Sequence, residues 1–190
     1  MDIVSALSSG LLGAAAMFLF MELVTLSKLA NADMVRAVGS LFTRRYENSL
    51  KVGLTLHLIA GLGFGLAYCG MLNLIGSNEI AVNVGIGVFS GFVHGFLVSY
   101  VILIEGQNRH PLTEFRSAGF EVAVAHVVGH VFYGAIVAYS YATQVLPAST
   151  TEVTFTGWDI YQTYMAVLGT LTVLGLVALS IKNSLDNLQK

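Results

Sequence analysis

Charged residues are scarce in this chain. Only 11% of its 190 residues are Asp, Glu, Lys or Arg, against about 25% in an ordinary soluble domain. Hydrophobic residues make up 55%, and the mean hydropathy is +0.75. So few charges cannot cover a water-soluble surface, and the composition predicts an integral membrane protein in contact with the lipid bilayer. There is no basic stretch suited to nucleic acid, so we expect no nucleic-acid partner.

Cysteine, proline and the common catalytic motifs are also rare or missing. Cys69 is the only cysteine, so no intramolecular disulfide can form. Pro111 and Pro147 both fall between apolar runs, so no interrupted helix of the transporter type is predicted. The chain has no Walker loop and no GxSxG, HExxH, CxxC or CxxCH motif, which leaves nucleotide-driven, hydrolase and c-type haem functions unsupported. Whether the protein is an enzyme stays open.

Long apolar segments are what the sequence does have. A helix needs about 20 apolar residues to cross a hydrocarbon core about 30 Å thick. The segments that qualify are approximately residues 4–27, 51–76, 80–104, 118–143 and 159–181. The predicted fold is therefore an all-α, polytopic transmembrane helical bundle of five spans, forming a single domain over residues 1–190.

The loops between these spans are segregated by charge. All the basic residues lie in the loop 28–50 with its flank, in the loop after span three, or after span five: Lys28, Arg36, Arg44, Arg45, Lys51, Arg109, Arg116, Lys182 and Lys190. The charged residues on the opposite side are all acidic. The positive-inside rule puts the N-terminus outside and the C-terminus in the cytoplasm, and we expect a prokaryotic cytoplasmic (inner) membrane. An outer aromatic belt is predicted from Tyr68, Tyr139, Tyr141, Trp158, Tyr161 and Tyr164.

Two features of the cytoplasmic loops have a predicted conformation. In the basic loop 28–50, apolar residues alternate with basic ones after Asp33. A short interfacial helix starting near Asp33 and a solvated basic loop both fit this pattern. In the next cytoplasmic loop, we expect His110, beside Pro111, to be exposed to solvent.

Small residues and histidines recur every four positions in spans two and four. The two series are His57, Gly61 and Gly65 in span two, and His126, His130 and Gly134 in span four. Small residues at this spacing let helix backbones approach closely in lipid. Superposing the two series indicates a parallel duplication of spans one and two as spans three and four. The duplication would make His57 and His126 equivalent about a pseudo-twofold axis.

Several of these segments together resemble a known family. They are a Gly-rich first span, NADMVRAVGSLF in the first loop, HLIAGLGFGLAY in span two, GFVHG in span three and HVVGHVFYGAIVAY in span four. They resemble a family of small multi-pass, Gly-rich integral membrane proteins of bacteria and archaea. The resemblance covers roughly residues 10–141 and implies a helical bundle. It assigns no activity and no catalytic residue.

Ionisable side chains inside the predicted spans are the candidate site residues. They are Glu22, His57, His94, His126 and His130. A rise of ~1.5 Å per helical residue puts Glu22, His57 and His126 at one depth, with the other two nearer the midplane. An ionisable group in a bilayer costs about a few kcal/mol unless it is paired or faces a cavity. We therefore expect these side chains to converge on a common interior.

Metal or haem binding is the leading hypothesis for this cluster. All five residues are candidate ligands of a transition metal (Zn, Fe, Cu or Mn). For a b-type haem, His57 and His126 would be the axial ligands, with Gly61, Gly65 and Gly134 making room for the ring. Either cofactor would suit electron transfer or metal handling.

Other functions remain open beside the cofactor hypothesis. A proton path can run from Glu121 or Glu105 through His126 to His130 and His94. The histidines can also be packing residues that hydrogen-bond to hydroxyls or carbonyls. In that case the protein would be a non-catalytic accessory subunit of a larger membrane complex. Its Gly-rich helix faces would then pack against other subunits or a second copy.

Overall fold

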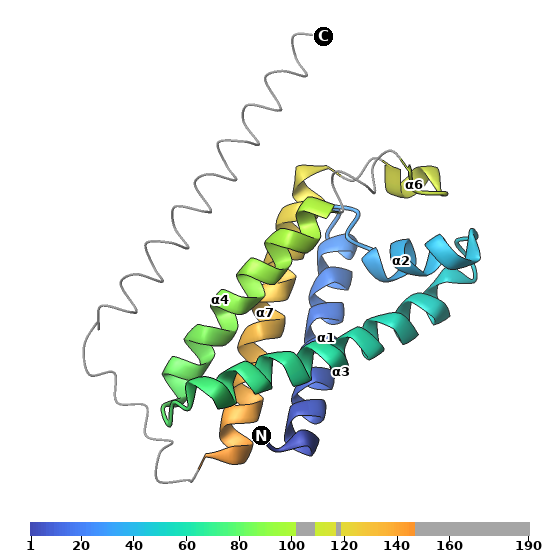
Figure 1. Cartoon of the computed structure of the whole chain (residues 1–190). Helices are drawn as coiled ribbons and strands as arrows, with labels where there is room; N and C mark the ends of the chain where they lie inside the picture. The colour runs from blue at the N-terminus through green and yellow to red at the C-terminus, as the bar shows by residue number, and fades with distance from the viewer. Residues whose placement is uncertain (102–108, 117–118, 147–190) are drawn as a thin grey trace. The chain divides into compact units, whose positions relative to one another are not determined.

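The computed structural model describes residues 1–101, 109–116 and 119–146, and every regular element in these ranges is an α-helix. In chain order they are α1 (Ile3–Leu26), α2 (Met34–Thr43), α3 (Ser49–Ile75), α4 (Ile80–Val101), α6 (Thr113–Arg116) and α7 (Phe120–Val145) (Figure 1). Within the described ranges, α1, α3, α4 and α7 are long and apolar enough to cross a membrane. These four match the first four predicted spans, whereas the predicted span 159–181 lies outside the described residues.

Side chains near the helix ends explain where α1 and α2 begin. Asp2 caps α1 by accepting a hydrogen bond from the Ser5 N–H at 2.7 Å. Asp33 caps α2 in the same way through the Arg36 N–H at 3.1 Å and also pairs with the Arg36 guanidinium at 3.0 Å. These caps satisfy N–H groups that have no partner inside the helix. The short helix predicted after Asp33 is thus confirmed, and the solvated loop is excluded.

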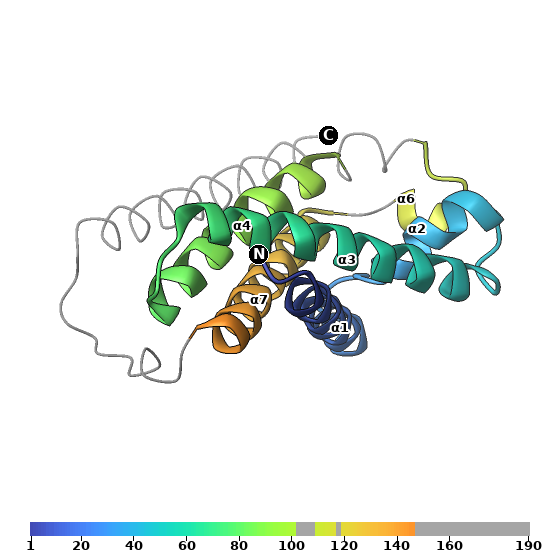
Figure 2. The same cartoon turned by 60° about the horizontal axis from the view of Figure 1, so that its bottom comes forward.

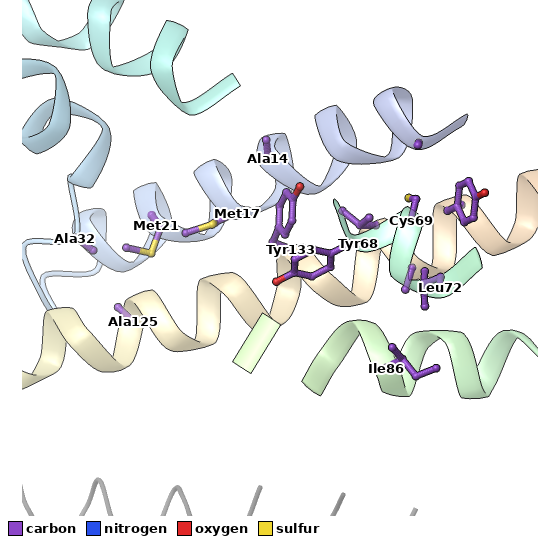
Figure 3. Close-up of a cluster of buried hydrophobic side chains, with 14 residues drawn as sticks. Ala14, Met17, Met21, Ala32, Tyr68, Cys69, Leu72, Ile86, Ala125 and Tyr133 are labelled. Atoms are coloured by element: carbon purple, nitrogen blue, oxygen red, sulfur yellow. The ribbon is translucent and has the colours of Figure 1, made fainter. Parts of the chain in front are cut away.

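Helix α7 is the central helix of the bundle. In its spanning window 61% of the residues are buried, compared with 33% in α1, 28% in α3 and 33% in α4. It packs against both α1 and α4, while α3 crosses the bundle and α2 packs beside the first turns of α3 (Figures 1 and 2). The buried core between these helices combines aromatic, methionine and small side chains, among them Met17, Tyr68 and Tyr133 (Figure 3).

Glycines allow the closest helix contacts. A Cβ on Gly65 of α3 would lie 2.6 Å from the Gly10 Cα of α1. In the α4–α7 pair, Cβ atoms on Gly87 and Gly134 would each overlap the other residue's carbonyl oxygen. The small-residue series therefore brings backbones together, as lipid-embedded packing requires.

His110 is buried, and the expectation that it is exposed was wrong. The side chain is only 5% exposed, and its Nε2–H donates to the Ala37 carbonyl of α2 at 3.0 Å. Its Nδ1 accepts from the Leu112 N–H at 3.1 Å, and its ring packs edge-on against Phe115. The loop turns through α6 and folds back on α2. That contact is distant in sequence, so residue type and loop position could not reveal it.

Candidate functional site

A cavity of about 390 Å³ lies among α1, α2, α3, α4 and α7. The five predicted site residues all line it, namely Glu22, His57, His94, His126 and His130. They come from four different helices, α1, α3, α4 and α7. The fold and this cavity together define the class of the protein: a helical membrane protein with a histidine-lined interior cavity.

Three of the histidines form a continuous group of rings. The ring centroids of His94 and His130 are 4.4 Å apart, with the rings nearly perpendicular at 71°. The rings of His126 and His130 follow at 5.6 Å on the same helix. The close approach of α4 makes the first contact possible, because a Cβ on Gly95 would lie 2.8 Å from the His130 Cβ. A larger residue at position 95 would separate the two helices.

Backbone carbonyls orient two of the imidazoles. The Nδ1–H of His130 donates to the His126 carbonyl at 2.8 Å, one helical turn earlier. The Nε2–H of His57 donates across to the Ala14 carbonyl of α1 at 3.0 Å. A carbonyl only accepts, so each bond fixes where the ring's proton sits. His130 therefore keeps a lone pair on Nε2, and His57 keeps one on Nδ1.

His126 lacks a partner for one ring nitrogen. The residue is 5% exposed and lines the cavity. Its Nδ1 is the one buried side-chain nitrogen or oxygen in the described part of the chain without a hydrogen-bond partner. Leaving a buried polar group unpaired costs about 1–3 kcal/mol. The cavity wall therefore includes an imidazole with an unmet hydrogen bond, and a turn of the ring would bring the shielded Nδ1 to the cavity.

Two tyrosines belong to the site, and sequence reasoning missed both. The Tyr68 hydroxyl lies 3.2 Å from His94 Nδ1, and the Tyr133 hydroxyl donates to the Gly61 carbonyl at 2.8 Å. Their rings meet edge-on at 5.5 Å. Tyr68 is 6% exposed, so its assignment to an aromatic belt was wrong. Tyr133, three positions after His130, lies on the same helical side, and that spacing was an available signal.

The candidate metal ligands are neighbours but do not form a complete coordination sphere. Within residues 1–101, 109–116 and 119–146, no three His, Cys, Asp or Glu side chains are arranged to hold one ion. Glu22 and His57 line the cavity together with the three-ring group. Coordination by all five residues therefore stays a prediction.

The glycines suggested for haem lie in helix contacts. A Cβ on Gly61 would lie 2.6 Å from the Ala14 Cβ, and Gly65 meets Gly10. Gly134 meets Gly87. Neighbouring helices occupy the space next to all three glycines, so the contacts supply no separate evidence for a haem ring. The haem hypothesis stays a prediction.

Comparisons with protein-family models, curated proteins and solved structures found no match for this chain.

Proposed function

We propose that this protein binds a transition metal ion (Zn, Fe, Cu or Mn) in its histidine-lined cavity, for metal handling or electron transfer. The observation that carries the proposal is the hydrogen bond from His130 Nδ1–H to a backbone carbonyl. Metal-bound histidines almost always donate their other ring N–H to a carbonyl or carboxylate, which orients the ring and raises its basicity. His130 already has this arrangement, with Nε2 left free.

His94 and His126 supply the next ligands. The His94 Nε2 becomes a ligand when Nδ1–H donates to the Tyr68 oxygen, 3.2 Å away. Nδ1 of His126 has no partner, so a metal bond would remove the cost of its burial. Bringing these nitrogens to about 2.0–2.1 Å from one ion requires side-chain rotation, with His57 and Glu22 as further candidate ligands.

Metal analysis of the purified protein tests the proposal. The wild type, in detergent and after exposure to each metal, is expected to retain stoichiometric metal by elemental analysis. Co²⁺ loading is expected to give the visible bands of a nitrogen-coordinated site. The double variant His94→Ala/His130→Ala should lose both signals, while His110→Gln, which removes a histidine outside the cavity, should keep them. Metal-free wild type, or a double variant that keeps its metal, would overturn the proposal.

The haem hypothesis is tested by the same preparation. A b-type haem held by His57 and His126 would give an intense Soret absorption band that is lost in His57→Ala and His126→Ala. A colourless protein that binds metal would favour the ion over the haem.

The proposal includes the membrane arrangement: five spans in a prokaryotic cytoplasmic membrane, with the N-terminus outside. The support is the segregation of the basic residues described above, together with the amphipathic α2 in the basic loop. Membership of the family of small, Gly-rich multi-pass membrane proteins is part of the same proposal. Reporter fusions after residues 45, 78 and 190 should place the first and third in the cytoplasm and the second outside.

The duplication of spans one and two is a further part of the proposal. When the sequences of α1 and α4 are aligned from their first residues, Gly10 pairs with Gly87, and when His57 is aligned with His126, Gly65 pairs with Gly134. In support, Gly10 contacts Gly65 and Gly87 contacts Gly134.

The alternative is an accessory subunit of a larger membrane complex. In its favour, Gly63 and Gly85 have open space where a side chain would stand, so another helix can approach there. Stable co-purification of larger membrane proteins, lost in Gly63→Leu or Gly85→Leu, would support this role. A chain that purifies as a monomer would exclude it.

A further inference from the structure

The cavity is much larger than a metal ion requires. One water molecule takes about 30 Å³ of liquid volume, whereas small-molecule pockets measure about 300–1,000 Å³. At about 390 Å³ the cavity falls in the second range. We infer that it takes an organic ligand from the bilayer: a neutral, ring-headed lipid of the quinone class. This inference goes beyond the proposed function and does not require a bound metal.

The walls of the cavity are mostly apolar. Methionine, phenylalanine and valine side chains from three helices line it: Met17, Phe18 and Met21 of α1, Val35, Val38 and Phe42 of α2, and Phe64 of α3. Methionine adapts to irregular shapes, and aromatic rings pack against flat ones. Such walls suit a flat ring with a hydrocarbon tail.

The mouth of the cavity is apolar as well. Three residues that line it are exposed on the surface: Val38 at 40%, Phe42 at 69% and Phe64 at 42%. In a membrane-spanning bundle, exposed apolar side chains face the acyl chains rather than water. The ligand therefore enters sideways from the lipid.

The charges at the cavity select a neutral headgroup. Among the described residues that line it there is no Lys or Arg, whereas Glu22 is one of them. A fatty acid or an anionic phospholipid would bring a negative charge close to Glu22 without a cation to compensate. A carbonyl-bearing ring brings none.

The polar groups are matched to a ring with carbonyl oxygens. His126 has an unpaired ring nitrogen and needs a partner in the cavity. The rings of Phe64 and His94, which also line the cavity, have centroids 4.0 Å apart and offer aromatic surface to a flat ligand. A turn of the His126 ring brings its shielded Nδ1 to the cavity, where a quinone carbonyl oxygen accepts the proton and supplies the missing hydrogen bond.

Binding of decylubiquinone tests the inference. Wild-type protein in nanodiscs of neutral lipid is expected to bind it saturably after chelation, with one molecule per chain. Ala60→Trp, at an exposed cavity-lining position, should abolish binding. The matched control Leu58→Trp, exposed on the same helix and not among the lining residues, should bind like wild type. His126→Phe should weaken binding by about tenfold, since it removes one buried hydrogen bond.

Competition and metal content separate the possible outcomes. Decanoic acid and decane should not displace the quinone, and equal displacement by either would overturn the inference. Quinone binding by metal-free protein that never takes up metal would support the inference while refuting the metal proposal. A metal-binding protein that does not take up the quinone would do the reverse. Unchanged binding in Ala60→Trp would also overturn the inference, provided both tryptophan variants unfold at the wild-type temperature.

Discussion

The two long helix pairs, α1–α3 and α4–α7, each have a close contact between glycines, but they differ in how far along the helices the contact continues. In α4–α7, contact continues from Gly87 against Gly134 to the Ser99 hydroxyl, which donates to the Ala123 carbonyl at 3.0 Å. In α1–α3 the glycine contacts lie around Gly10 and Gly65, beyond the His57–Ala14 hydrogen bond. Towards its first turn α3 packs on α2 instead, and the cavity lies between these helices.

The inserted helix α2 accounts for the difference. A Cβ on Gly53 of α3 would overlap the Val35 carbonyl, and a Cβ on Gly39 of α2 would overlap the Ser49 carbonyl. Near its first turns, helix α3 therefore packs against the short α2 instead of the long α1. The matching segment of the second pair holds only the four-residue α6 in its described part. We call α4–α7 the closed pair, because its helices stay in contact from Gly87 to Ser99, and α1–α3 the open pair, because α3 leaves α1 for α2. The closed pair positions the three histidine rings, and the open pair leaves space for the cavity.

Gly134→Leu should have the largest effect, because it acts on the closed pair. The new side chain would meet the Gly87 backbone, which cannot move aside. Overpacking costs about 1–3 kcal/mol, and a backbone contact should put this variant at or above the upper end. We expect a strong loss of folded protein by fluorescence-detected size exclusion. Gly63→Leu, placed in open space, is the control, and equal losses from both would show that the closed contact is not special.

Tyr68→Phe should have the next largest effect, because it removes the hydrogen bond that joins α3 to α4 beside the cavity. Tyr68 on α3 reaches His94 on α4 at 3.2 Å. Groups that orient a metal ligand typically change affinity by about 10–100-fold. Metal titration should show a loss in that range with the fold kept. Tyr139→Phe, which removes the hydroxyl of an exposed tyrosine outside the cavity lining, should leave affinity within about twofold. An unchanged affinity in Tyr68→Phe would exclude His94 as an oriented ligand.

The parts of this structure that follow local rules could be predicted from the sequence. Span length and hydropathy located α1, α3, α4 and α7. For α2, Asp33 indicated where a helix would start, but a solvated loop fitted the same residues. Helical rise placed His94 and His130 at one level, and their rings are in contact. Contacts between segments that are distant in the sequence could not be predicted from these local patterns. The bond of His110 to Ala37 and that of Tyr68 to His94 depend on how α2 and α4 dock, which no local pattern encodes.

Asp33→Ala should loosen the open pair by a smaller amount. It removes the cap of α2 and the partner of Arg36 at 3.0 Å. Loss of an N-cap costs about 0.5–2 kcal/mol, and loss of the ion pair adds to this, because the Asp33 side chain is only 10% exposed. The thermal unfolding temperature in detergent should fall by a few degrees, because each kcal/mol lost lowers it by about 2–4 °C in a chain of this size. Asp33→Asn retains a capping oxygen and should recover the part of the loss that comes from the cap; if it recovers nothing, the cap is not the cause.

Asp2 should give the smallest effect, through pH rather than packing. The Ser5 N–H bonds to the Asp2 carboxylate and lowers its pKa below the ordinary value of 3.8. The folded pKa is the lower one, so the stabilisation is fully present above the unfolded pKa and is lost as the pH falls through the folded pKa. Unfolding temperatures of wild type and Asp2→Asn should therefore differ slightly at pH 6 and by less at about pH 3. A difference that stays the same size in acid would mean that Asp2 acts through something other than its charge. The closed pair provides the contrast, because the stability lost in Gly134→Leu should be the same at both pH values.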